Sequence, residues 1–84
     1  MAFKNRSRIE IVAVILQASV EPILKTQIMY KAYLSSLQLN EYLDMLTANK
    51  MMHFDKEIGT YAITTKGTNF LATYDTLDPL VIKR

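Results

Sequence analysis

The residues that could support catalysis or hold a metal ion are few and scattered along this chain of 84 residues. It contains one histidine, His53, no cysteine and only two glycines. His53 stands in an alternating, strand-like pattern beside Met52 and Phe54, and no second histidine or cysteine exists to complete a metal site with it. Glu41 and Asp44 lie one helical turn apart, which is more typical of a solvated helix face than of a cation site. We therefore expect a protein that is not an enzyme and that uses no metal and no cofactor.

A second group of residues has types suited to contact with nucleic acid. Gln38 and Asn40 carry amides that can pair with two atoms of adenine, and Leu37 can lie against a thymine methyl group. Lys25 and Lys56 flank this group in the sequence. The formal net charge of +2 permits contact with a polyanion without requiring it.

A helix over residues 35–50 is predicted to present these side chains. Ser35 followed by Gln38 fits a capping box, in which the hydroxyl and the amide each bond a backbone N–H at the helix start. Four apolar residues recur at i, i+3, i+4 and i+7, the spacing of one buried helical stripe: Leu39, Tyr42, Leu43 and Leu46. The presented part of this helix is expected to span residues 36–49.

The remaining periodicities predict one domain over residues 1–84, of α+β class and mostly α. Short turns between helices and a change from helical to alternating spacing after Lys50 indicate a helix-turn-helix followed by a β-hairpin. The predicted segments are a basic arm (1–6), a first helix (7–20), a short strand (22–24), a helix-turn-helix (25–50), a hairpin (51–64) and a last helix (65–78) that Pro79 ends or bends. This order of helix, short strand, helix, helix, hairpin and C-terminal helix is that of a winged helix-turn-helix.

The composition agrees with a small folded domain in a reducing compartment. Half of the residues are hydrophobic and 21% are charged, which favours a globular fold over disorder. The longest apolar run, residues 11–16, is far shorter than the ~20 residues that span a membrane. With no cysteine and no signal-peptide pattern, we expect a cytoplasmic protein.

The first helix carries apolar residues on two faces, which predicts contact with a second chain. We expect Ile9, Val12, Ala13, Leu16 and Val20 to form the core stripe. An opposite stripe and the last helix would then supply a homodimer interface formed by Ile11, Ile15, Ala18, Phe70, Tyr74 and Leu77. Packing of the stripe against the chain's own last helix is the alternative.

Three stretches resemble a known family. Residues 26–35 (TQIMYKAYLS) resemble the motif K-T-x-I-M-Y-x-A-x-L-S of small archaeal winged-helix proteins, and residues 38–46 (QLNEYLDML) resemble the helix that follows it. Residues 64–71 (TTKGTNFL) look like the T-x-K-G-x-x-F-L that closes the hairpin in that family. The resemblance implies a DNA-binding regulator or chromatin-associated protein, and some members of that family dimerise through a long C-terminal helix that forms an antiparallel coiled coil. Pro79 and the few residues after it depart from that pattern, so any dimer here is expected to use a shorter last helix.

The sequence therefore predicts a transcriptional regulator that binds double-stranded DNA as a homodimer. The residues expected at the DNA are Arg6, Arg8, Lys25, Thr26, Lys31, Ser36, Leu37, Gln38, Asn40 and Lys56. Residues 36–49 contain no lysine or arginine but do contain Glu41 and Asp44, which disfavours strong nonspecific binding. The alternative is a winged-helix module that docks a protein through this acidic and partly apolar helix face.

Overall fold

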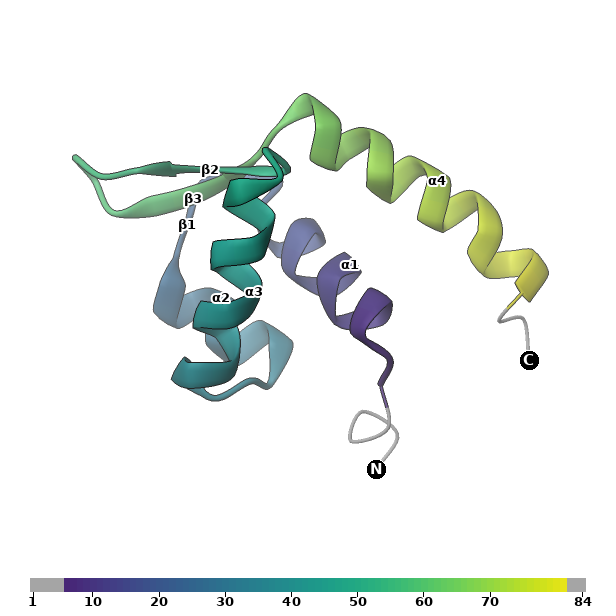
Figure 1. Ribbon diagram of the computed structural model, residues 1–84, viewed down its shortest axis with the longest axis horizontal. Coiled ribbons are helices and arrows are strands. Elements are labelled where there is room, and N and C mark those ends of the chain that lie inside the picture. The colour runs from purple at the N-terminus through teal and green to yellow at the C-terminus, as the bar shows by residue number, and fades with distance from the viewer. Residues whose placement is uncertain (1–5, 82–84) are drawn as a thin grey trace.

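The computed structural model describes residues 6–81, with side chains through Tyr74, so most of the predicted basic arm and the side chain of Leu77 lie outside the described residues. Its elements are α1 (Arg8–Ala18), β1 (Ile23–Leu24), α2 (Lys25–Ala32), α3 (Ser36–Ala48), β2 (Met52–Asp55), β3 (Thr60–Ile63) and α4 (Thr65–Val81). This order confirms the predicted one. In Figure 1 the β2–β3 hairpin projects to the left of the helices, whereas α4 runs to the right and away from α3.

The core lies where α1, α2 and α3 meet the sheet. Its fully buried side chains come from all three helices: Ile15, Leu16, Ile28, Leu39, Leu43 and Leu46. The stripe predicted for the third helix is confirmed, because Leu39, Tyr42, Leu43 and Leu46 are all buried. Met52 from β2 and Leu71 from α4 extend the same cluster, which ties the hairpin and the last helix to the bundle.

The core face of α1 differs from the prediction. Ile15 is fully buried, so it is a core residue and cannot belong to an exposed dimer stripe. Ile9 and Val20, predicted for the core, are instead 49% and 54% exposed. The reason for Val20 is that α1 ends at Ala18, before the predicted end at residue 20. Ser19 follows as the C-cap, with its buried hydroxyl donating to the Leu16 carbonyl at 3.0 Å.

The three strands form one antiparallel sheet in the order β1-β3-β2. Ile23 and Phe54 both pair with Tyr61, so these three side chains share one face of the sheet. The hairpin turn is built on Asp55, whose carboxylate accepts the backbone N–H of Glu57 at 3.0 Å, while Gly59 takes a positive φ of 72°. We refer to this hairpin, β2, β3 and their turn, as the wing.

The start of α4 is fixed against the end of α3. Thr64 caps α4: its hydroxyl accepts the Gly67 N–H at 3.2 Å and donates to the Lys50 carbonyl at 2.6 Å. Helix α4 then continues through Pro79 to Val81 and corrects the predicted end at residue 78. The φ of proline, near −65°, is compatible with a helix, so a proline this close to the helix end costs only one backbone hydrogen bond and a local clash.

Among the described residues, no helix combines the length and the apolar character needed to span a bilayer.

Candidate nucleic-acid interface

Helix α3 presents its first turns to solvent, as its capping predicts. The Gln38 N–H donates to the Ser35 hydroxyl at 3.2 Å, and the Ser35 N–H donates to the Gln38 amide oxygen at 3.1 Å, which confirms the capping box. Leu37 is 72% exposed, and Ser36 and Asn40 are exposed beside it. These three side chains are therefore available to a groove of DNA.

Gln38 is less available than the sequence suggests. A bidentate contact with adenine needs both the oxygen and the nitrogen of an amide. The Gln38 oxygen already accepts the Ser35 N–H, so reading adenine with both atoms would open the α3 cap. Asn40 makes no such cap, and it is the amide best placed for adenine on the exposed face.

The outward face of α3 becomes acidic after its first turns. Leu37, Glu41, Asp44 and Ala48 follow at helical spacing and are all exposed. Asp44 lies close enough to β3 to affect Tyr61: burial raises the pKa of the Tyr61 phenol, and the negative charge of Asp44 raises it further. The negative field of this face therefore reaches β3 in the wing.

The start of α2 is a second feature that is suited to bind an anion. The residue before the helix is Leu24, which offers no side-chain acceptor to the first-turn N–H groups, whereas Ser7 and Ser35 cap α1 and α3. Lys25 and Thr26 are the first two residues of α2. N–H groups at a helix start, together with a lysine and a threonine hydroxyl, form a suitable contact for a phosphate.

The wing tip carries one cation and one anion. Lys56 and Glu57 are both exposed there, next to Ile58, which is 64% exposed. One residue pair before the turn, the rings of Phe54 and Tyr61 lie with centroids 4.7 Å apart. In Figure 1 the wing tip, the start of α2 and the start of α3 all lie toward the left edge of the molecule, away from α4.

The structure does not bring three other predicted cations to this edge. The Arg8 guanidinium lies over the Tyr42 ring, 5.0 Å from its centroid, and so packs α1 on α3. Arg6 donates to the Ala32 carbonyl at the end of α2. Lys31 lies on the side of α2 that faces α1, where it lines a cleft with Ala18.

The predicted dimer residues are only partly at the surface. Ile11, Ala18, Phe70 and Tyr74 are half-buried and pack against the core, whereas Ile15 lies inside it. An apolar groove of about 260 Å³ lies between the start of α1, the end of α3 and α4, and Ile9 and Phe70 contribute to its lining. All three members of the predicted α1 stripe, Ile11, Ile15 and Ala18, therefore help to pack α1 within the chain.

Comparison with known sequences decides the family. A sequence profile described as winged helix-turn-helix matches residues 5–81, nearly the whole chain. The chain belongs to the winged helix-turn-helix family. A search of curated proteins found no match. In this winged helix-turn-helix domain, α2 and α3 with the turn at residues 33–35 form the helix-turn-helix.

Two further exposed residues of the domain, Tyr30 and Ile58, were not predicted from the sequence. Tyr30 is 77% exposed and lies one turn after Thr26 on the outer face of α2, opposite the buried Ile28. Its position in the helical repeat was a usable signal, because Tyr30 lies roughly opposite Ile28 on a helical wheel. Ile58 at the wing tip had no such signal, since the turn conformation sets its exposure.

Among the described residues, no group of three or more histidine, cysteine, aspartate or glutamate side chains lies close enough to hold a metal ion. His53 is exposed on β2.

Proposed function

We propose that this winged helix-turn-helix domain binds double-stranded DNA and acts as a transcriptional regulator. The first turns of α3 would lie in the major groove, with the start of α2 and the wing tip on the flanking phosphates. The observation that carries the proposal is the presentation of Leu37 and Asn40 at the exposed start of α3. In Figure 1 this start lies on the same edge as the start of α2, which begins with Lys25, and the wing tip, which contains Lys56.

The roles of individual residues follow from their chemistry. Asn40 can pair with adenine, and Leu37 can contact the methyl group of a neighbouring thymine. Lys25, with the uncapped N–H groups of α2, would bind one phosphate, and Lys56 would bind another near the wing. Thr26 and Tyr30 carry hydroxyls on the same outer face of α2 and would add phosphate contacts.

The acidic half of α3 sets a limit on how the helix approaches DNA. Glu41 and Asp44 would meet the negative field of the phosphates, so the helix is expected to enter the groove with its N-terminus first. Affinity that depends on few cations is modest and sensitive to salt. A homodimer would double the phosphate contacts, and we propose one on that ground. The same reasoning favours a sequence-dependent regulator over a protein that coats DNA.

The salt dependence of DNA binding tests this proposal. Fluorescence anisotropy with a short labelled duplex would be recorded over a series of salt concentrations for the wild type and for a Lys25→Ala/Lys56→Ala variant. The slope of log affinity against log salt should fall by about two units, one for each lost phosphate contact. Lys31→Ala is the matched control, because Lys31 faces α1, and it should leave the slope unchanged.

A protein-docking role is the second candidate, and the strip formed by Leu37, Glu41, Asp44 and Ala48 favours it. An acidic and apolar helix face suits a basic protein segment better than it suits DNA. Absence of DNA binding at low salt, or a slope that the double variant shares with the wild type, would contradict DNA binding and favour docking.

A further inference from the structure

The capping box of α3 uses only one end of the Gln38 amide. The amide oxygen accepts the Ser35 N–H at 3.1 Å, and the backbone N–H of Gln38 donates to the Ser35 hydroxyl at 3.2 Å. Among residues 6–74, this cap bond is the one hydrogen bond that the Gln38 side chain makes. The amide nitrogen, with its two hydrogens, therefore remains as a donor at the exposed start of α3.

Gln38 lies beside the two residues proposed to contact bases. On a helical wheel Leu37 lies between Gln38 and Asn40, and all three side chains are exposed at the start of α3. With the first turns of α3 in the major groove, the Gln38 nitrogen would face base edges together with these two side chains.

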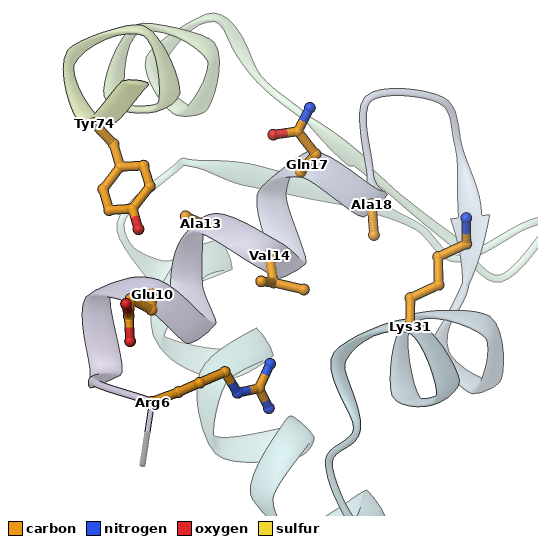
Figure 2. A pocket seen from close by; sticks show the side chains of 8 residues that line it. All are labelled: Arg6, Glu10, Ala13, Val14, Gln17, Ala18, Lys31 and Tyr74. Carbon is orange, nitrogen blue, oxygen red and sulfur yellow. The ribbon is translucent and has the colours of Figure 1, made fainter. Parts of the chain in front are cut away.

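The other two glutamines of the chain have different positions. Gln17 lines a cleft along α1 with Lys31, as Figure 2 shows. The Gln27 oxygen accepts the Leu24 N–H at 3.1 Å, so this amide also caps a helix, but it lies at the start of α2, which is proposed to contact phosphates. Gln38 is therefore the glutamine that would face the bases.

Guanine and adenine differ in what they offer to a donor. In the major groove guanine presents two acceptors, N7 and O6, whereas adenine presents the N7 acceptor beside an amino group that is itself a donor. Glutamine reads adenine with both atoms of its amide, and the Gln38 oxygen could do so only by leaving the Ser35 N–H. With the cap closed, the Gln38 nitrogen would meet two acceptors on guanine but a competing donor on adenine.

We propose, on the basis of the proposed DNA binding, that Gln38 selects guanine over adenine at one base pair of the recognised site. The amide nitrogen donates to O6 and N7 of guanine while the amide oxygen keeps the α3 cap closed. The expected preference is about tenfold, toward the lower end of what a good bidentate pair contributes, because both acceptors share one donor nitrogen.

Selection from a pool of duplexes with a random central segment, carried out with the wild type and with Gln38→Glu, tests this role. Glutamate keeps an oxygen for the Ser35 N–H, as in the S-x-x-E form of the capping box, but it carries no donor. The wild type should enrich guanine at one base pair. Gln38→Glu should lose that preference and favour cytosine there, because a carboxylate accepts from the cytosine amino group.

Fluorescence anisotropy with the selected duplex then measures the preference directly. Replacement of that guanine by adenine should weaken binding by the wild type about tenfold, and 7-deazaguanine, which lacks the N7 acceptor, should weaken it as well. Ala48→Glu is the matched control, because it adds the same charge to an exposed site at the far end of α3. It should lower the affinity for every duplex and keep the preference for guanine.

The outcomes separate the role of Gln38 from DNA binding itself. Equal binding of the guanine and adenine duplexes by the wild type, or a guanine preference that persists in Gln38→Glu, would overturn the role of Gln38 and leave DNA binding in place. A loss of stability to urea in Gln38→Glu as large as that in Ser35→Ala would contradict the cap on which this role depends. A pool with no enrichment and no binding at low salt would overturn the proposed function, and the role of Gln38 with it.

Discussion

Replacement of Gly67 by alanine should destabilise this domain, although the same change in most helices has the opposite effect. Gly67 lies in the first turn of α4 and is buried. In an exposed helix, alanine is more favourable than glycine by about 1 kcal/mol. Here a Cβ atom at position 67 would lie 2.3 Å from the Met51 carbonyl oxygen and 2.7 Å from Cγ1 of Ile63. The first of these neighbours is backbone and cannot rotate away.

The expected cost follows from what must move. Relief of the clash requires the start of α4 to separate from the end of α3, and overpacking of this kind costs about 1–3 kcal/mol. The Met51 carbonyl also accepts the Thr64 N–H at 3.0 Å, and loss of that bond adds about 1 kcal/mol. Set against the helix propensity gained, the net loss of unfolding free energy is about 1–3 kcal/mol. For a domain of this size, that lowers the melting temperature by about 5–20 °C.

Thermal and urea unfolding followed by circular dichroism would measure this loss. Gly59→Ala is the informative companion variant, because no atom lies within 4 Å of its added Cβ while its φ of 72° is left-handed. Its cost should be about 1–2 kcal/mol, from backbone strain alone. A Gly67→Ala protein that melts at or above the wild-type temperature would refute the close packing of α4 on Met51.

Three further predictions concern the core, the α3 cap and the wing. Ile15→Ala should cost about 2–4 kcal/mol of unfolding free energy by leaving a cavity, whereas Val20→Ala at an exposed site should change it by less than about 1 kcal/mol; equal costs would contradict the burial of Ile15. Ser35→Ala should remove about 1 kcal/mol with the α3 cap, and unchanged urea unfolding would show that the cap contributes nothing. Because the pKa of Tyr61 is raised in the fold, its contribution to stability is fully present below the ordinary value of 10.0 and is lost as pH rises through the folded pKa. Tyrosinate absorbance should show a lower Tyr61 pKa in Asp44→Asn, and no change would place Asp44 too far away to act.

Local signals in the sequence predicted the helix starts and the element order well. Each capping box, at Ser7 and at Ser35, involves only four consecutive residues, so the local sequence determines it. The end of α1 could not be predicted in the same way, because Ser19 is fixed by tertiary structure: its carbonyl accepts the N–H of Ile63 from β3 at 2.8 Å. The buried side of α1 was equally ambiguous, since apolar residues occupy two of its faces and only packing selects Ile15.

The candidate DNA site was predictable where exposure follows helical periodicity, as for Leu37 and Asn40. It was not predictable where a side chain has a second partner within the fold. The sequence around Arg8 predicts a phosphate contact from the N-terminal arm, because it does not show the contact of Arg8 with the Tyr42 ring. The sequence likewise predicts a phosphate contact for Lys31, because it does not show that α1 lies against that side of α2.

The surface that contacts DNA can be located by a single measurement, an NMR titration of the ¹⁵N-labelled chain with a short duplex at low salt. We expect the amide signals of residues 36–40, Lys25 and Lys56 to shift together, while those of Gln17 in α1 and Lys31 on the side of α2 that faces α1 do not. Shifts confined to Gln17 and Lys31, or a spectrum that the duplex leaves unchanged, would contradict the proposal that the start of α3 binds DNA.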